Sequence, residues 1–230
     1  MQKKKIVVLT GAGISAESGL LTFRDAGGLW EGYDIYEVAT PEGWQKNQDL
    51  VLDFYNQRRE GVRNAKPNAA HYALKKLEEK FDVVIITQNI DDLHEKAGST
   101  NILHLHGEIT KAQSSRYPEL VYDLGNKNIK KGDVCEKGHQ LRPHVVWFGE
   151  AVPMMENAML EASTADIFMV IGTSLAVYPA ANLVHYVPAG AQKYIIDPNI
   201  PAGIIDKSIV KIAKKASEGL PLLISELLNS

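Results

Sequence analysis

Short apolar runs recur along the chain, and segments with helical spacing of their apolar residues lie between them. The runs are apolar at successive positions, and most are rich in β-branched residues, a pattern typical of strands buried on both faces of a sheet. We therefore predict strands at 6-IVVLT-10, 82-DVVIIT-87, 102-ILHL-105, 144-HVVWF-148, 166-DIFMVIG-172, 193-KYIID-197 and 209-IVKIA-213.

The clearest helical segment covers residues 69–80, where apolar residues fall on one face and lysines and glutamates on the other. Asn68 precedes it, and Asn is a favoured N-cap. Further helices are predicted over 91–98 and 217–228. Strands that alternate with helices indicate an α/β fold, in which a Rossmann-like parallel sheet has helices on both faces. Such sheets bind ligands at the carboxyl ends of their strands.

Two stretches interrupt this alternation. Residues 26–65 are helical and aromatic without a convincing strand, and residues 107–142 are polar and rich in turn residues. We interpret both as insertions that build a smaller domain. This division assigns residues 1–25, 66–106 and 143–230 to the larger domain.

The composition is that of an ordinary globular chain, because 230 residues with 45% hydrophobic content can bury one large core. The 25 basic and 28 acidic residues are interspersed, so no basic stripe favours nucleic acid as a partner. The apolar runs are far too short to span a bilayer, and the single Cys135 excludes an internal disulfide framework. We expect a cytoplasmic protein without nucleic-acid or membrane partners, and the sequence carries no signal for the oligomeric state.

The first strand runs into a glycine-rich stretch, 9-LTGAGISAESGLLTFRDAGGLW-30. Gly11, Gly13 and Ala16 satisfy the G-x-G-x-x-G/A pattern, in which glycines let backbone N–H groups approach a pyrophosphate. A Rossmann site also places an acidic residue about 20 residues later, at the end of a second strand, and no strand precedes that position here. A plain glycine turn is therefore an equal alternative. Arg24 beside a glycine pair favours a loop that closes over an anion.

Polar side chains follow other predicted strands as well. Helix capping by Asn89 or Asp91 explains part of one such group, and a lone histidine is more often structural than catalytic. Because the carboxyl ends of parallel strands meet at one edge of a sheet, the groups together indicate one shared cleft. They are 87-TQNIDDLH-94, 104-HLHGE-108, 172-GTSLAVYPAANL-183 and 197-DPN-199.

The chain resembles the sirtuin family, which deacylates protein lysines with consumption of NAD. The resemblance covers nearly the whole chain and is weakest over residues 108–141. It implies a Rossmann-type large domain, a small domain made from insertions, and an acyl-lysine protein or peptide bound between them. The implied products are free lysine, nicotinamide and O-acyl-ADP-ribose. The segments that carry the resemblance are 11-GAGISAESGLLTFR-24, 88-QNID-91, 106-HG-107, 146-VWFGE-150 and 172-GTS-174.

The resemblance also implies roles for individual positions. His106 matches the catalytic base, and Gln88 and Asn89 belong to the same catalytic group. The edge on which the family pairs the substrate peptide as an added strand matches Val146, Trp147, Phe148, Gly149 and Glu150. The NAD contacts match Gly11, Ala12, Gly13, Glu17, Thr22, Phe23, Arg24, Trp30, Gln88, Asn89, Ile90, Asp91, Gly172, Thr173, Ser174, Asp197, Pro198, Asn199 and Ala216.

The acyl group is indicated by 50-LVLDFYNQRRE-60. If this segment is helical, its apolar face ends in the phenol of Tyr55 and the guanidinium of Arg58. The commoner fate of a helical arginine is to extend from the core edge or to pair with a nearby carboxylate. However, Tyr-x-x-Arg at this place resembles the sirtuin subclass that removes acidic acyl groups. We therefore expect desuccinylation and demalonylation alongside deacetylation.

One departure from the family concerns zinc. Sirtuins usually carry two C-x-x-C pairs that hold a structural zinc ion in the small domain. Here Ser114 stands where a first cysteine is expected, and Cys135 and His139 offer at most two ligands. We therefore expect NAD as the co-substrate and no zinc.

Two other functions remain as alternatives. A mono-ADP-ribosyltransferase would cleave the same bond in NAD, although the intact segment 146–150 disfavours it. A non-catalytic NAD-binding module would explain the incomplete zinc motif, although it would have no need of a base at His106.

Overall fold

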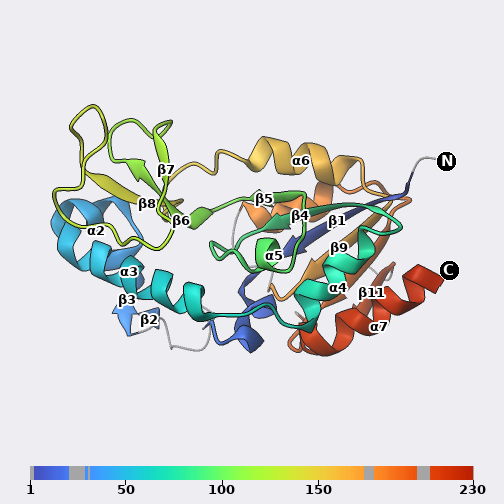
Figure 1. Cartoon of the computed structure of the whole chain (residues 1–230). Coiled ribbons are helices and arrows are strands. Elements are labelled where there is room, and N and C mark those ends of the chain that lie inside the picture. Colours follow the sequence, from blue (N-terminus) through green and yellow to red (C-terminus); the bar gives the residue numbers. More distant parts are fainter. Residues whose placement is uncertain (1–2, 21–28, 31, 174–178, 201–207, 230) are drawn as a thin grey trace.

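A computed structural model describes residues 3–20, 29–30, 32–173, 179–200 and 208–229. Its largest layer is a six-stranded sheet in the order β11-β10-β9-β1-β4-β5, and all of the neighbouring strands in it are parallel (Figure 1). The predicted α/β fold is confirmed. The strands are β1 (Lys5–Thr10), β4 (Asp82–Thr87), β5 (Ile102–His104), β9 (Ile167–Ile171), β10 (Gln192–Ile196) and β11 (Ile209–Ile212).

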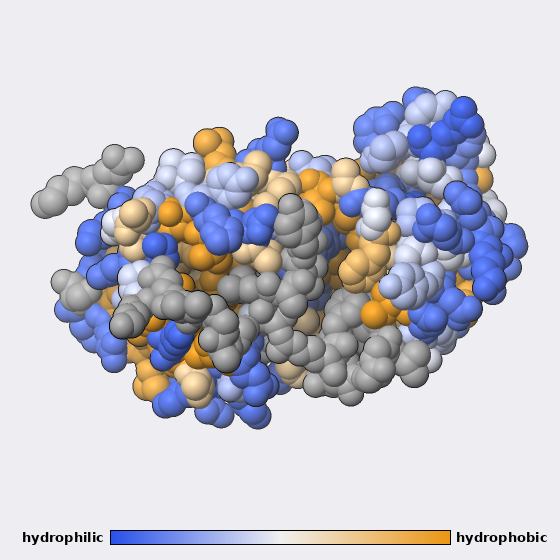
Figure 2. Space-filling model, turned by 180° about the vertical axis from the view of Figure 1, so that it is seen from behind, coloured by the Kyte–Doolittle hydropathy of each residue, from blue (hydrophilic) through white to orange (hydrophobic). Residues whose placement is uncertain are grey.

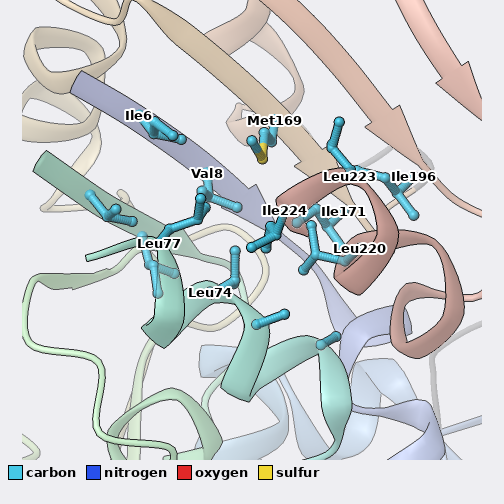
Figure 3. Packing of buried hydrophobic residues seen from close by; sticks show 14 of the residues in the cluster. Ile6, Val8, Leu74, Leu77, Met169, Ile171, Ile196, Leu220, Leu223 and Ile224 are labelled. Atoms are coloured by element: carbon cyan, nitrogen blue, oxygen red, sulfur yellow. The ribbon is translucent and has the colours of Figure 1, made fainter. Parts of the chain in front are cut away.

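Helices cover both faces of this sheet, which explains why its strands are apolar at successive positions. Ile6 and Val8 of β1 face α4 (Ala69–Leu77) and α7 (Ala216–Asn229), as Figure 3 shows. Val7 and Leu9 face the opposite way, toward α6 (Met155–Ser163) and the 3-10 helix η3 (Ala180–Tyr186). Each fully buried aliphatic side chain of this kind contributes about 1.5–3 kcal/mol relative to an exposed one.

The predicted helices are present, with small shifts at their ends. Asn68 caps α4, because its side chain accepts a hydrogen bond from the backbone N–H of Ala70 at 2.9 Å. The capping box is closed by His71, whose Nδ1 accepts from the Asn68 N–H at 3.2 Å. The helix predicted over 91–98 is the short α5 (Leu93–Lys96), and Gly98 follows it with φ of 93°. Helix α7 begins at Ala216, one residue before the predicted start.

A second cluster of elements lies beside the parallel sheet, at left in Figure 1. It packs Val51 and Phe54 of a long helix against Ile109 and Val145 of a small antiparallel sheet, β7-β6-β8. Where this end appears at right in Figure 2, its surface is mostly hydrophilic. The elements are α1 (Ile35–Val38), α2 (Pro41–Lys46), α3 (Gln48–Asn64), β6 (Gly107–Ser114), β7 (Val121–Asp123) and β8 (Leu141–Val145).

Sequence patterns missed or misplaced several strands in this second part. The strand predicted over 144–148 ends at Val145, and it pairs antiparallel with β6 instead of joining the parallel sheet. The polar segment 107–142 contains β6 and β7, whose polar and apolar residues do not follow the pattern of a doubly buried strand. The segment 26–65 also holds the two-residue strands β2 (Leu29–Trp30) and β3 (Tyr33–Asp34).

A buried arginine fixes α3 to the small sheet. Arg59 is 1% exposed, and its Nε donates to the carbonyl oxygen of Ile109 at 2.7 Å. A second guanidinium nitrogen donates to the Asn56 side chain at 2.6 Å. Burial lowers the pKa of Arg59 to about 10, so the side chain stays charged at neutral pH.

None of the helices in the described ranges is both long and apolar enough to cross a membrane.

Candidate active site

Glycines allow the ends of β1 and β9 to touch. A Cβ on Gly13 would lie 2.7 Å from the Cα of Gly172, and one on Gly11 would lie 2.7 Å from the Cβ of Thr173. The Gly13 N–H donates to the Gly172 carbonyl at 2.8 Å. Gly172 itself has φ of 61°, which disfavours other residues. The glycines are therefore required by backbone packing at the carboxyl edge of the sheet, where a ligand of this fold would bind.

The end of β4 adds a buried polar cluster to this edge. The Asn89 side chain donates to the Gly11 carbonyl at 3.2 Å and to the Ser15 hydroxyl at 3.1 Å. That hydroxyl donates in turn to the Asp91 carboxylate at 3.0 Å. Burial raises the pKa of Asp91, although hydrogen bonds from Leu93 and Ser15 oppose the shift. Ser15 was missed by the sequence analysis, because a small polar residue in a loop carries no signal of its own.

Asp91 also contacts the start of α5, although the N-cap position belongs to Asp92, whose side chain makes no cap hydrogen bond. The second carboxylate oxygen of Asp91 accepts from the Leu93 N–H at 3.1 Å. The same carboxylate therefore serves both the helix start and the polar cluster with Ser15.

Gln88 joins the ends of β4 and β9. Its side-chain nitrogen donates to the Thr173 hydroxyl at 3.2 Å, and its backbone N–H donates to the Thr10 carbonyl at 2.9 Å. The amide of Gln88 and the hydroxyl of Thr173 thus lie beside Gly11 at one edge. The polar ends of these two strands therefore meet at one edge of the sheet, and the shared cleft stays a prediction.

His106 lies on the same edge with a defined orientation. Its Nδ1 is 2.9 Å from the Gln88 carbonyl oxygen, which can only accept, so Nδ1 carries a proton. Nε2 is then the nitrogen that can take up a proton from another group. Burial lowers the pKa of His106, which keeps the ring neutral at pH 7. A neutral, oriented imidazole is suited to act as a general base.

The segment 146–150 follows β8 and lies next to His106, whose carbonyl accepts from the Val146 N–H at 2.9 Å. Glu150 holds the turn, because its carboxylate accepts from the Trp147 N–H at 2.8 Å and from both terminal nitrogens of Arg142 at 2.8 and 2.9 Å. The Arg142 guanidinium also lies 3.7 Å from the centre of the Trp147 ring. Arg142 is a further residue that sequence reasoning missed.

The side chains in 146–150 differ in exposure. Trp147 is 2% exposed, so its indole packs in the core, whereas Phe148 is 46% exposed. The Phe148 N–H donates to the Ala39 carbonyl at 2.9 Å, which ties the turn to the end of α1. Val146 and Gly149 complete the segment, and Gly149 has φ of 89°.

Tyr55 and Arg58 lie one turn apart on α3, as predicted. Tyr55 is 2% exposed, and its hydroxyl accepts from the Trp147 indole N–H at 3.1 Å. Burial raises the pKa of Tyr55, and the nearby positive charge of Arg58 opposes that shift. Arg58 is half-buried, with its guanidinium 5.8 Å from the centre of the Phe54 ring.

The remaining NAD-contact positions are spread more widely. Glu17 accepts from the Ser217 N–H at 3.3 Å, at the start of α7. Asp197 caps the turn after β10 by accepting from the Asn199 N–H at 2.7 Å, and Pro198 between them is exposed.

Three further positions have apolar or backbone surroundings. Ala216 is buried against α4, Ile90 packs against the second cluster, and Ala12 lies in a 3-10 turn after β1. Thr22, Phe23, Arg24, Ser174 and the side chain of Trp30 fall outside the described residues.

Ser114 and Cys135, the two positions compared above with zinc ligands, are hydrogen-bonded to each other. Cys135 is buried, and its Sγ donates to the Ser114 hydroxyl at 3.3 Å. In the part of the chain that the structure describes, three or more His, Cys, Asp or Glu side chains are nowhere arranged to hold a metal ion. One thiol and one hydroxyl do not supply the four ligands of a structural zinc site.

The donor set at the sheet edge fits NAD. Amide, hydroxyl and carboxylate groups from Ser15, Asn89 and Asp91 are buried together, and such groups bind ribose hydroxyls and a carboxamide by hydrogen bonds. Ser15 follows β1, and Asn89 and Asp91 follow β4, so the cluster lies where the ends of these two neighbouring strands meet.

Known proteins are similar to this chain over most of its length. The Sir2 family model matches residues 11–179. A protein named NAD-dependent protein deacylase from Bacteroides thetaiotaomicron is 54% identical over 222 residues, with 94% of this chain and 95% of the relative covered. One of the same name from Helicobacter pylori is 50% identical, with 98% of both chains covered.

Solved structures are similar over the same length. A Sir2 homologue in complex with NAD superimposes with a TM-score of 0.88 at 39% identity, covering 99% of this chain and 90% of that one. A Sir2 variant described with a deacetylated p53 peptide and 3'-O-acetyl-ADP-ribose gives a TM-score of 0.80 at 31% identity, with coverages of 97% and 94%. The chain belongs to the Sir2 family.

Proposed function

We propose that this chain is an NAD-dependent protein-lysine deacylase that acts on acyl-lysine in proteins or peptides, with acidic acyl groups among its substrates. The observation that carries the proposal is the position of His106, whose ring is oriented by the Gln88 carbonyl at 2.9 Å beside the buried cluster of Asn89 and Asp91. The names of the relatives support the same activity.

In this mechanism His106 acts as the general base. Its Nδ1–H is held by the Gln88 carbonyl, so Nε2 is the nitrogen left to accept a proton from a ribose hydroxyl. Because burial lowers the pKa of His106, the ring is ready to accept that proton at neutral pH. When bound, NAD supplies the ADP-ribosyl group that receives the acyl group and leaves as O-acyl-ADP-ribose.

Asn89, Ser15 and Asp91 have a binding and orienting role. Their mutual hydrogen bonds of 3.0 and 3.1 Å fix the polar groups before a ligand arrives. A rigid set of donors and acceptors lowers the entropy lost when the ribose is held in line for reaction.

The substrate peptide is proposed to bind along 146–150. Glu150 and Arg142 hold this turn in one shape, and its first N–H is bonded to the His106 carbonyl. A peptide that adds to this edge as a strand would therefore bring its acyl-lysine close to the base.

Selectivity for acidic acyl groups is proposed to come from Arg58. The half-buried guanidinium lies on the face of α3 that carries Tyr55, and Tyr55 is linked to the peptide-binding turn through Trp147. A charge-assisted hydrogen bond from Arg58 to a succinyl or malonyl carboxylate would favour these groups over acetyl.

The proposal also includes a division into two domains and a location in the cell. The chain works as a larger domain of residues 1–25, 66–106 and 143–230 and a smaller domain of residues 26–65 and 107–142, with the substrate between them. The protein acts in the cytoplasm, in keeping with its single cysteine.

The test is to incubate the purified protein with NAD and an acyl-lysine peptide and to weigh both peptide and protein. Loss of the acyl mass with release of nicotinamide supports deacylation. Addition of an ADP-ribosyl mass to a protein would support the transferase alternative, and binding of NAD without any product would support a non-catalytic module.

A further inference from the structure

Four successive carbonyl oxygens, those of residues 87 to 90, each accept a hydrogen bond from the segment 104–109. This segment contains the end of β5 and the start of β6. Backbone N–H groups serve the first and the last of these oxygens, and two histidine rings serve the middle two. The pairs are Thr87 O with Leu105 N at 2.9 Å, Gln88 O with His106 Nδ1 at 2.9 Å, Asn89 O with His104 Nδ1 at 3.2 Å and Ile90 O with Ile109 N at 2.8 Å. The two histidine rings thus bind the carbonyl groups of the two residues that follow the end of β4.

His104 differs from His106 in the partner of its second nitrogen. Its Nε2 lies 2.7 Å from a carboxylate oxygen of Glu95, and its Nδ1 faces the Asn89 carbonyl. Both partners are acceptors, so the two hydrogen bonds exist together only if both nitrogens carry protons. The geometry therefore requires an imidazolium at His104, whereas His106 needs only one proton.

Charged groups from several elements surround His104. Burial would lower its pKa, but the hydrogen bond and charge of Glu95 on α5 and the charge of Glu108 on β6 raise it overall. His104 in turn holds the pKa of Glu95 below its usual range, against the effect of burial. The other titratable groups that feel its charge are Asp91, His94 on α5 and His144 on β8.

We infer that His104, kept as an imidazolium by Glu95, is a positioning residue that fixes the Asn89 peptide and thereby the nicotinamide and ribose side of the NAD site. The inference rests on the proposed function for the location of that site. The competing explanation is an ion pair that stabilises the fold alone. The two differ in one consequence, because a positioning role makes NAD affinity depend on the charge of His104.

The charge can be read directly by long-range ¹H–¹⁵N NMR of the histidine side chains in the unaltered protein. We expect His104 to show two protonated nitrogens at pH 7 and to lose one as the pH rises, and His106 to show protonated Nδ1 and bare Nε2. A neutral His104 at pH 7 would overturn the inference, whatever the variants do.

The coupling is tested by titrating NAD into the wild type and Glu95→Gln across pH 6 to 9, without turnover. Glutamine keeps an acceptor oxygen at Glu95 but removes its charge, so the pKa of His104 falls. We expect the alkaline weakening of NAD binding to move to lower pH, with affinity at pH 7.5 reduced about three- to tenfold. Glu95→Asp, which keeps the charge, should restore part of that loss.

Glu108→Gln is the matched control, because it removes a nearby negative charge that makes no hydrogen bond to the ring. It should shift the profile less than Glu95→Gln. If Glu95→Gln lowers the melting temperature but leaves NAD affinity and its pH dependence unchanged, the ion pair is purely structural and the inference fails. A pH-dependent NAD response without turnover of any acyl peptide would support the positioning role while contradicting the proposed deacylation.

Discussion

The Nδ1 atom of His106 lies 2.9 Å from the backbone carbonyl oxygen of Gln88. A carbonyl can only accept, so this contact selects the tautomer in which Nδ1 is protonated and Nε2 is the basic nitrogen. The ring is thus oriented by the chain before any ligand binds. Its proposed role as a base rests on that orientation and on the burial that keeps it neutral.

Replacing His106 with alanine should abolish deacylation and leave the fold intact. The side chain makes its hydrogen bond at a strand end outside the main hydrophobic clusters, so its loss costs little packing. Turnover should fall by about 10²–10⁴-fold or more, the usual contribution of a general base. Nicotinamide release and circular dichroism measured on the same sample check this. Normal turnover by the folded variant would remove His106 from its proposed role.

Arg58→Met should separate the acidic acyl groups from acetyl. Loss of a charge-assisted hydrogen bond of about 1.5–3 kcal/mol predicts a roughly ten- to hundredfold drop in kcat/KM for succinyl- and malonyl-peptides. Turnover of the acetyl-peptide should change little. The measurement is kcat/KM for the three matched peptides.

Arg63→Met provides the control for that experiment. Arg63 lies on the same helix, but its guanidinium donates to the Lys127 carbonyl at 2.6 Å, away from Tyr55. It should leave the ratio of succinyl to acetyl turnover unchanged. If the Arg58 and Arg63 variants show the same ratio of succinyl to acetyl turnover, Arg58 has only a structural role.

His71 should make the protein less stable in mild acid. Burial lowers the pKa of His71 to about 4, and its ring centre lies 5.0 Å from that of His94, whose pKa burial also lowers. In the unfolded chain a histidine takes up a proton below about pH 6.5. Stability is therefore fully present above pH 6.5 and is lost as the pH falls toward 4, by about 2 kcal/mol at pH 5 for His71 alone.

Urea unfolding at pH 7 and pH 5 measures this loss, with His71→Gln as the comparison. Glutamine at this N3 position can keep the capping-box contact, because its side-chain oxygen accepts from the Asn68 N–H and does not titrate. The informative quantity is the difference between the two pH values, which should be smaller in the variant. An equal pH dependence in both proteins would assign the acid sensitivity to other groups.

Chelation should not unfold the small antiparallel sheet. Cys135 and Ser114 meet through a 3.3 Å hydrogen bond, and packing around Ile109 and Ile129 supplies the core there. We expect elemental analysis to find no stoichiometric zinc in protein purified without added metal. EDTA should also leave the melting temperature unchanged. One zinc per chain, with a melting temperature that falls on chelation, would contradict this expectation.

The parallel sheet could be predicted well from sequence, because the burial of each strand sets a local pattern of apolar residues. A strand such as β4 is buried on both faces and must be apolar at successive positions, and the polar residues from Gln88 onward then mark its end. Strand β6 is half-exposed, so its sequence GEITKAQS resembles a loop. Its identity depends on pairing with β7 and β8, which no local pattern encodes.

The same limit applies to the candidate site. Arg58 and Arg59 are neighbours of one residue type, and helical phase placed Arg58 on the apolar face. The structure leaves Arg58 half-buried beside Phe54 and buries Arg59 completely, because a carbonyl fifty residues away, at Ile109, accepts from the Arg59 guanidinium. Ser15 and Arg142 were likewise missed, since their partners Asp91 and Glu150 become neighbours only in the fold. Sequence motifs could nominate Asn89 and Asp91 as site residues, but the contact of Asp91 with Ser15 could be seen only in the fold.

The most direct test of the proposed activity uses NAD and matched acetyl-, succinyl- and malonyl-lysine peptides with the purified protein, following nicotinamide release and peptide mass. We predict NAD-dependent loss of the acyl group from all three, with succinyl and malonyl favoured over acetyl. Activity on the acetyl-peptide alone would refute the proposed role of Arg58 but would leave the assignment as a deacylase intact. Absence of turnover with every peptide, in a protein that still binds NAD, would contradict the proposed function.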